Sequence, residues 1–522
     1  MASDSHPRPA TPSRRSFLQG ATGAALALPL VGIGRPGGAQ PGPAPPPRLP
    51  DGLFSLGVAS GDPLADAVVL WTRLAPAPLQ GGGMPATDVP VRWEVADDER
   101  FRRPVRRGVA VASPAWGHTV HVDVRGLRPA SWYHYRFRVG DQTSPVGRTR
   151  TAPAPGRGDA LRFLVASCQN WKDGYWPGWA HAPADDPDLV VHLGDYIYES
   201  GHSTGTVRDH NSPEIRTLDD YRNRYGLYKG DASLQAAHAT CPWVVTWDDH
   251  EVENNYAGLV PDDPAEAPDF PARRAAAYQA WWEHQPVRLR PPTGPSLRIH
   301  RSVGWGRLAR FHVLDGRQHR DDQPCGHDGD LGPDCPERSD ATRTLLGADQ
   351  ERWLGRSLRR SPATWDVLAN PVVMTSMPLA EVVFNRDQWD GYPAARTRLL
   401  DQIRAGHVAN PVVVTGDIHA AGVADVVDEG AGAPPVATEL VGSSISSSFP
   451  AELADVAEQL IRALPHVRWA DTRRRGYVRC DVSPHELVAR FQLSDSVQVP
   501  DAPVTTATTW TITAGTVGAE ET

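Results

Sequence analysis

Between residues 51 and 150, apolar and polar positions alternate along several short stretches. Val91, Trp93 and Val95 have polar neighbours, and two later stretches repeat this pattern. Those stretches run from Val120 to Val124 and from Tyr133 to Val139. A period of two between turn residues is typical of half-buried strands, so this segment is expected to form an all-β domain.

After residue 159 the apolar positions become continuous. The apolar runs are Leu161–Ala166, Leu189–Leu193, Trp243–Thr246, Leu308–Leu314, Val367–Met374 and Pro411–Thr415. Continuous apolarity suits strands that are covered on both faces. Between the runs, apolar side chains recur at helical spacing from Arg273 to His284 and from Leu345 to Leu358. Strands that alternate with helices predict a layered α/β domain over residues 160–492.

The two ends of the chain differ from this pattern. Residues 1–40 hold Arg14 and Arg15 ahead of an apolar run that is too short to span a bilayer. This order is typical of a signal peptide, and the arginine pair predicts a twin-arginine export signal. A proline-rich linker follows from Pro41 to Pro50. Residues 493–522 are expected to form a partly mobile carboxyl-terminal tail.

Composition narrows the class of protein. The 522 residues are 40% apolar with a formal net charge of −9, so a large core is possible and a basic footprint for nucleic acid is missing. No transmembrane segment is expected after the signal, and a monomer is the default expectation. Among the five cysteines, Cys325 and Cys335 bracket a loop and suit a disulfide in an oxidising compartment. Export therefore predicts a secreted or periplasmic location, with Cys168 expected to stay unpaired.

Four of the apolar runs end in residue types that bind metals. The residues that follow these runs are Ser167-Cys168-Gln169-Asn170, Gly194-Asp195-Tyr196-Ile197-Tyr198-Glu199, Asp248-Asp249-His250-Glu251 and Gly416-Asp417-Ile418-His419. In α/β sheets ligands bind outside the carboxyl ends of the strands, where loops from neighbouring strands converge. One such loop is usually only a turn or a cap. Four in one domain predict a metal site.

The segments that begin at Gly194, Asp248 and Gly416 resemble the metal-binding blocks of the calcineurin-like metallophosphoesterases. Cys168 stands in place of that superfamily's first Asp-x-His block, and together with Gly57–Pro63 it resembles the alkaline phosphatase D (PhoD-like) family. Further matching motifs are Gln318–Pro324 and Phe384–Tyr392, and the resemblance covers roughly residues 51–490. It implies a layered calcineurin-like metallophosphoesterase domain, in which helices flank β-sheets.

The amino-terminal strands carry a second resemblance. Leu127, Pro129, Tyr133 and Tyr135 resemble the tyrosine corner of fibronectin-type sandwiches. We therefore expect a small fibronectin-like β-sandwich over residues 51–150, with a structural or positioning role.

One expected metal position combines different ligand types. Cys168, Asp195, Tyr198 and His419 offer a thiolate, a carboxylate, a phenolate and an imidazole, which suit a strongly Lewis-acidic transition metal. Asp195 and Tyr198 lie three residues apart, so a tight turn can aim both at one ion while Asp195 bridges to a second. The donor set suggests Fe(III), and the family resemblance implies the same.

The second expected position is rich in oxygen. Asp195, Asp249 and Asp417 favour a hard ion such as Ca²⁺, which the resemblance also implies. Asp248 is either a further ligand or a hydrogen-bond acceptor beside the ligands. Carboxylates replace the Asn and His of the superfamily's second site, which argues against Zn²⁺; Mn²⁺ and Co²⁺ are also less favoured than Fe(III) and Ca²⁺.

Two further residues are candidates for contact with substrate. His250 follows Asp249 and matches the superfamily's histidine that contacts the phosphoryl group, although it could instead cap a turn. Arg386 lies in an Asn-Arg-Asp loop and is either a substrate contact or a residue of a surface ion pair.

These residues lead to one hypothesis for function and two rivals. The hypothesis is metal-dependent hydrolysis of phosphate esters, of the alkaline phosphatase type, by a metal-activated hydroxide that attacks phosphorus. The nearest rival is phosphodiesterase or phospholipase D-like activity on diesters. The other is a non-catalytic envelope protein that binds metal or phosphate.

Overall fold

The computed structural model describes residues 49–522 except residues 211, 327–331, 380–381, 384 and 429–432. The expected signal peptide lies outside the described residues, and so does most of the proline-rich linker. Within the described part of the chain, no helix has the length and apolarity that crossing a bilayer requires.

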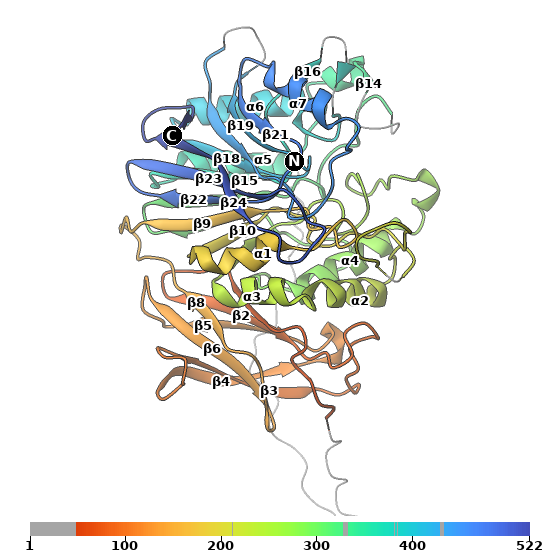
Figure 1. The fold of residues 1–522 in the computed structure, drawn as a ribbon, viewed down its shortest axis with the longest axis vertical. Helices are drawn as coiled ribbons and strands as arrows, with labels where there is room; N and C mark the ends of the chain where they lie inside the picture. Colours follow the sequence, from red (N-terminus) through yellow and green to blue (C-terminus); the bar gives the residue numbers. More distant parts are fainter. Residues whose placement is uncertain (1–48, 211, 327–331, 380–381, 384, 429–432) are drawn as a thin grey trace, which may run out of the picture. The chain divides into compact units, whose positions relative to one another are not determined.

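Two β-sheets form the centre of the fold (Figure 1). In spatial order, the strands of the first sheet are β25 (Glu520–Glu521), β24 (Thr505–Thr513), β23 (Glu486–Ser494), β22 (Arg475–Val482), β9 (Leu161–Ala166), β10 (Leu189–His192), β11 (Trp243–Val245), β1 (Val58–Gly61), β2 (Ala67–Arg73) and β5 (Thr119–Arg125). Those of the second sheet are β12 (Arg301–Trp305), β13 (Ala309–Val313), β15 (Trp365–Ala369), β18 (Pro411–Thr415), β20 (Ala437–Val441), β19 (Ala421–Val426) and β21 (Val467–Asp471). Buried side chains of both sheets form one shared core, in which the rings of Phe163 and Phe311 lie 5.1 Å apart.

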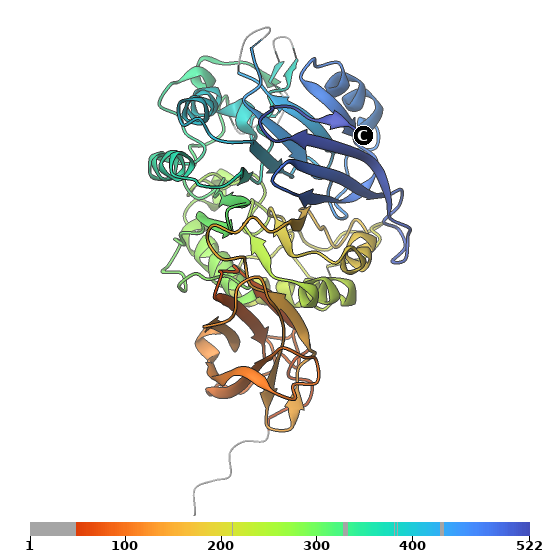
Figure 2. The same ribbon diagram turned by 90° about the vertical axis from the view of Figure 1, so that its left-hand side faces the viewer.

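Helices cover the outer faces of these sheets, as Figure 2 shows from the side. Those on the first sheet are α1 (Pro177–His181), α2 (Leu218–Lys229), α3 (Ala232–Thr240) and α4 (Phe270–His284). Those on the second sheet are α5 (Ala348–Arg359) and α6 (Pro393–Ala405), while α7 (Ala454–Arg462) lies beside β21. The order helix, sheet, sheet, helix confirms the predicted layered α/β fold.

The apolar runs of the sequence are strands, as predicted. Leu161–Ala166 and Pro411–Thr415 coincide with β9 and β18. The run that starts at Val367 leaves the strand after Ala369, and Pro371, which cannot donate to a ladder, lies two residues further on. Both expected helices are present, as α4 and α5.

The amino-terminal strands form two sheets around their own core. The second of these sheets contains β3 (Val89–Ala96), β4 (Pro104–Ala112), β6 (Trp132–Val139), β7 (Gln142–Thr143) and β8 (Gly147–Arg150). It packs on β2 and β5 through buried residues such as Val91, Tyr135 and Val122. The backbone N–H of Arg128 donates to the Tyr133 hydroxyl over 2.8 Å, the hydrogen bond expected of a tyrosine corner.

The sandwich is not separate from the α/β sheets. Gly61 of β1 pairs with Trp243 of β11, and the backbone N–H of Asp62 donates to the Trp243 carbonyl over 3.0 Å. One sheet of the sandwich therefore continues the ten-stranded sheet. This pairing joins segments about 180 residues apart, so no local pattern of side chains predicts it.

The expectation of a mobile tail over residues 493–522 is wrong. β24 pairs along its length with β23, and Trp510 and Ile512 are buried in the core between the sheets. The Thr-rich segment alternates inward apolar and outward polar residues, and threonine favours strands because it is β-branched. The carboxyl-terminal segment therefore forms the edge strands of the first sheet and is not a separate tail.

The cysteines divide as expected. Cys325 and Cys335 form a disulfide with 5.8 Å between their Cα atoms. Cys168, Cys241 and Cys480 are buried free thiols. A small fourth sheet, whose first strand lies within the disulfide loop, contains β14 (Gly332–Pro333), β16 (Pro378–Leu379) and β17 (Val382–Val383).

Candidate metal centre

The predicted ligand residues all follow strands that end at one place in the two sheets. β9, β10 and β11 are parallel neighbours, so their carboxyl ends lie side by side. β18 supplies the fourth loop from the facing sheet. Side chains from four separate loops therefore meet where both sheets end.

The first group of donors contains three ligand types. The ligand atoms of Cys168, Asp195 and His419 lie within 4.8 Å of one another. The Tyr198 hydroxyl donates to Asp195 Oδ2 over 3.0 Å and lies 3.3 Å from His419 Nε2. Thiol, phenol, imidazole and carboxylate thus occupy one small space, as the sequence predicts.

Asp195 also belongs to a second group. Its ligand atoms lie within 4.8 Å of those of Asp249 and His250. The carboxylates of Asp248, Asp249 and Asp417 form a third group under the same limit. Asp195 therefore links the mixed donors to the carboxylates, which is the arrangement of a ligand that bridges two ions.

Another acidic cluster satisfies the same distance but differs chemically. Glu214, Glu253 and Glu266 also lie within 4.8 Å of one another. Arg273 lies among them, with its guanidinium nitrogens 2.6, 3.3 and 2.9 Å from the three carboxylates. An arginine already supplies the positive charge there, so this cluster needs no metal.

The backbone around the donors is held in a costly conformation. Cys168, Asp195, Asp417 and His419 have φ values of 56°, 54°, 68° and 54°. Such left-handed conformations cost roughly 1 kcal/mol or more per non-glycine residue, and they gather at functional sites. Gly194, with φ of 114°, lies so close to the next loop that a Cβ would meet the Asp248 nitrogen at 2.5 Å.

Three carboxylate oxygens at the centre accept no hydrogen bond, although Asp249 Oδ1 lies 3.4 Å from the Arg317 guanidinium. Asp195 Oδ1, Asp248 Oδ2 and Asp249 Oδ1 are buried without a hydrogen bond. A buried carboxylate oxygen normally has a partner, because leaving it unpaired costs several kcal/mol. These orphaned oxygens, together with a thiol and an imidazole, fit the coordination of cations.

The ligand loops are fixed by bonds from outside the donor groups. Glu251, 1% exposed, accepts hydrogen bonds from the backbone N–H groups of Asp195, Tyr196 and Asp248 over 3.0, 2.7 and 2.8 Å. His419 Nδ1 donates to the Ser448 carbonyl over 3.0 Å, which leaves the Nε2 lone pair available to a metal ion. Partners of this kind orient metal-binding side chains and set their tautomers.

The electrostatics of the protein alone are unfavourable for so many acids. Burial raises the pKa of Asp195 and of Asp417 well above the usual range, and neighbouring carboxylates raise both further. Burial raises the pKa of the Cys168 thiol and lowers that of His419 to about 4. Acids that are hard to ionise alone become ligands once a cation compensates their charge.

Comparison with known proteins decides the family. The family model described as "PhoD-like phosphatase" matches residues 163–491, and the model of its N-terminal domain matches residues 41–153. Alkaline phosphatase D from Bacillus subtilis is 46% identical over 507 residues, which cover 94% of this chain and 86% of that protein.

The chain belongs to the PhoD-like phosphatase family. Its reaction class is accordingly the hydrolysis of phosphoric esters, as predicted. A solved structure titled "Structure of PhoD" has 45% sequence identity and a TM-score of 0.86, covering 91% of this chain and 93% of that one. A purple acid phosphatase from yellow lupin seeds, 13% identical with a TM-score of 0.51, covers 86% of this chain and 73% of its own, and it supports the fold alone.

In this PhoD-like phosphatase, Arg317 is a central residue that the sequence analysis missed. Its fully buried guanidinium donates to Asp248 over 2.5 Å and to Asp387 over 2.6 Å, and it lies 3.4 Å from Asp249. Its ion pairs connect the loop after β11 to the loop that contains Asn385, Arg386 and Asp387. The only signal in the sequence was the position of Arg317 just before the Gln318–Pro324 motif.

Asp248 has one oxygen that accepts a hydrogen bond from Arg317 and one oxygen without a hydrogen bond at the centre. This arrangement is compatible with both predicted roles of Asp248, as a metal ligand and as a hydrogen-bond acceptor beside the ligands.

The two predicted substrate contacts differ in their settings. His250 Nδ1 lies 2.7 Å from Glu199 Oε2, and its ring lies 4.1 Å from that of Tyr198. Burial opposes protonation of His250, but Glu199, Asp249 and Asp195 outweigh it and raise its pKa. Arg386 is buried and donates to the Pro333 carbonyl of β14 over 2.9 Å. A role for Arg386 in binding substrate stays a prediction.

Proposed function

We propose that this chain hydrolyses phosphate esters at a multinuclear metal centre held by Cys168, Asp195, Tyr198, Asp248, Asp249, Asp417 and His419. The observation that carries the proposal is the place of Asp195, whose carboxylate belongs both to the group with Cys168 and His419 and to the group with Asp249 and His250. Asp249 belongs in turn to the group that contains only carboxylates. A single ion would not need two donor groups that share one carboxylate. A bridging carboxylate is typical of centres that hold two metals close together.

The donor chemistry suggests which metals the centre takes. Cys168, Tyr198 and His419 with Asp195 suit Fe(III), because thiolate and phenolate stabilise a strongly acidic transition metal. The cluster of Asp248, Asp249 and Asp417 contains only oxygen, and oxygen ligands suit Ca²⁺. Zn²⁺ fits the all-oxygen position less well, and Mn²⁺ and Co²⁺ are also less favoured than Fe(III) and Ca²⁺ in this proposal.

The protein groups around the centre have distinct roles in the proposed reaction. Bound ions supply Lewis acidity, which offsets charge on the phosphoryl oxygens and lowers the pKa of water. Glu199 orients the His250 ring through its bond to Nδ1, and the Tyr198 ring packs against it at a tilt of 31°. His250 is thereby placed to hydrogen-bond a phosphoryl oxygen or to give a proton to the leaving oxygen. Its place beside Asp195 and Asp249 would equally allow it to be a ligand.

Export and the compartment are part of the same proposal. The arginine pair at Arg14 and Arg15 supports the twin-arginine route, which carries folded proteins. The disulfide between Cys325 and Cys335 supports an oxidising location outside the cytoplasm. The protein is proposed to act as a secreted or periplasmic monomer.

The test compares ester classes with and without metal. Hydrolysis of p-nitrophenyl phosphate and of bis(p-nitrophenyl) phosphate is measured before and after removal of metal by chelation. The proposal expects loss of activity on chelation and recovery on adding iron with calcium. Higher kcat/KM for the bis-ester would identify the phosphodiesterase alternative. Full activity in chelated, metal-free protein would contradict the proposal.

A further inference from the structure

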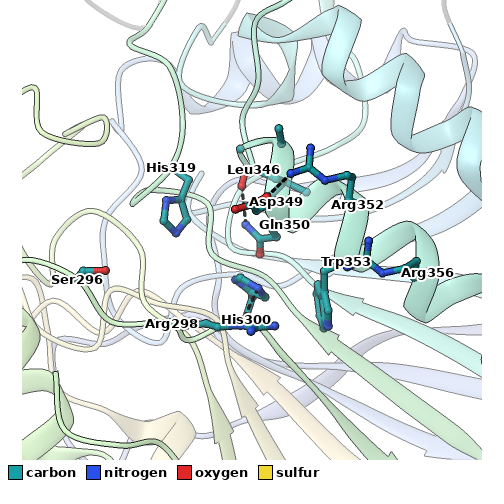
Figure 3. A pocket seen from close by; sticks show the side chains of 12 residues that line it. Ser296, Arg298, His300, His319, Leu346, Asp349, Gln350, Arg352, Trp353 and Arg356 are labelled. Carbon is teal, nitrogen blue, oxygen red and sulfur yellow. Dashed lines mark hydrogen bonds and ion pairs between the residues drawn. The ribbon is translucent and has the colours of Figure 1, made fainter. Parts of the chain in front are cut away.

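A serine-rich loop after β20, residues 443–448, lies against the proposed metal centre. It differs in this from the polar cavity beside α5 that Figure 3 shows, which contains none of the donor residues and whose ion pair of Asp349 and Arg352 is exposed to solvent. Buried hydroxyl groups need hydrogen-bond partners, so the contacts of the loop indicate its role. The fully buried serines of the loop are Ser443, Ser444, Ser446 and Ser447.

The loop joins the two facing sheets at the end where the donors lie. It follows β20 of the second sheet, and Ser444 pairs in parallel with Ser167, which directly follows β9 of the first sheet. The backbone N–H of Ile445 donates to the Ser167 carbonyl over 3.0 Å. At the other end of the loop, the Ser448 carbonyl accepts the bond from His419 Nδ1. One short loop therefore fixes both sheets beside the mixed donors, which come from both of them.

Cys168 is held at its backbone by the same loop. Its carbonyl accepts hydrogen bonds from the backbone N–H groups of Ser446 and Ser447 over 3.3 and 3.2 Å. The φ of Cys168 is 56°, and a left-handed conformation of this kind persists only where the surroundings fix it. The bonds from the serine loop supply that constraint.

The Ser447 hydroxyl connects this anchor to Tyr198. It accepts a bond from the Asn170 N–H over 3.1 Å, and its oxygen lies 2.7 Å from the Tyr198 oxygen and 2.8 Å from the Cys168 carbonyl. The Cys168 carbonyl already has two backbone donors, and the Tyr198 hydroxyl donates to Asp195. The single proton of the Ser447 hydroxyl is therefore best used on the Tyr198 oxygen.

We propose that Ser447 is a positioning residue for the ion that Cys168 and Tyr198 would hold. Its hydroxyl fixes the Tyr198 oxygen, and its backbone fixes the Cys168 loop, so that both donors face one place. Ser447 is not itself a proposed ligand, so it can orient the donors without competing for the ion. The inference rests on the proposed function, because it concerns a metal position of that centre.

The variant Ser447→Ala tests the proposal in the full chain loaded with Fe(III) and Ca²⁺. Affinity for Fe(III), measured by competition with a chelator, should fall roughly 10- to 100-fold, because a group that orients the ligands is lost. The charge-transfer absorption of a tyrosine bound to Fe(III) should move to longer wavelength. Without the hydrogen bond, the lone pairs of the Tyr198 oxygen are less stabilised, and their electrons pass to the metal at lower energy. A general loss of stability would lower the iron content without moving this band.

Ser443→Ala is the matched control. Ser443 is equally buried in the same loop, but its hydroxyl donates to the Arg474 carbonyl over 2.7 Å. The control should keep the iron affinity and the absorption band of the wild type. Wild-type affinity and band position in Ser447→Ala would overturn the proposal. So would equal changes in both variants, since any buried hydroxyl of the loop would then have the same effect.

A measurement on metal-depleted protein separates this proposal from the proposed function. In Ser447→Ala the Asn170 N–H loses its acceptor, so Cys168 should react with a thiol reagent several times faster than in the wild type, with the modified cysteine identified by mass spectrometry. A wild type without tyrosine–iron absorption would contradict the proposed iron position. Equal reactivity of Cys168 in Ser447→Ala and the wild type would contradict the role of Ser447, whichever metal is bound.

Discussion

Replacement of Glu251 by Gln tests how the ligand loops are held. Glu251 is buried beside the proposed metal ligands, and its two oxygens accept three backbone N–H bonds. Oε2 serves Asp195 and Asp248, while Oε1 serves Tyr196. Glutamine has only one acceptor oxygen. If that oxygen keeps the two bonds to Asp195 and Asp248, the NH₂ group takes the place of Oε1 and faces the Tyr196 N–H, so that two donors oppose each other.

The size of the effect depends on whether cations are bound. In the protein alone, burial raises the pKa of Glu251 to about 8, so at neutral pH the side chain is mostly protonated and glutamine is a close substitute. Bound cations favour the carboxylate, and one lost bond to a charged acceptor then costs about 1.5–3 kcal/mol. That cost appears only in the metal-loaded state, so metal affinity should fall roughly 10- to 100-fold.

Two measurements separate this effect from general damage. Metal affinity is measured by competition with a chelator, and stability of the metal-depleted protein is measured by urea unfolding. Glu253→Gln is the matched control, because Glu253 is similarly buried two residues away but lies 3.3 Å from Arg273, outside the donor groups. The reasoning is refuted if Glu251→Gln binds metal like the wild type, or if Glu253→Gln loses as much affinity.

Three other changes have definite expected outcomes. Gly194→Ala should abolish metal binding, measured by elemental analysis, because the new Cβ collides with the Asp248 backbone; wild-type metal content would contradict this. Burial lowers the pKa of His121 to about 4, so as pH falls from about 6.5 to 4 the unfolded chain binds a proton that the native state does not, at a cost of up to ~3 kcal/mol. In urea unfolding, His121→Gln should therefore lose less stability between pH 7 and pH 4 than the wild type; an identical loss would show that His121 is not the cause. Cys325→Ser/Cys335→Ser opens a disulfide with a sequence separation of 10, which should cost at most about 3 kcal/mol of unfolding free energy and leave metal content unchanged; loss of metal would mean that the loop supports the centre.

Local patterns were sufficient to predict the strands that carry the site. Strands such as β9 and β18 are buried on both faces, so their sequences are continuously apolar and their ends are sharp. The candidate ligand residues follow directly, and the side chains of Cys168 and His419 meet because β9 and β18 end at the same place in two facing sheets. The positions of the donors were therefore predictable from short segments.

Pairing between distant segments was not predictable in this way. β1 joins β11 through backbone hydrogen bonds that leave no specific trace in the side-chain pattern. The threonine-rich tail was interpreted by composition, although its alternation of buried and exposed residues indicates a strand. Arg317 was missed for a similar reason, since its importance comes from partners in two other loops.

The central claim is that Asp195 joins two metal positions into one centre. Elemental analysis of the wild type and of Asp195→Asn, each purified by the same route, tests it most directly. The account predicts more than one metal ion per wild-type chain, and loss of ions from both positions in the variant, while the variant stays folded. A variant that keeps the full wild-type metal content would contradict the account.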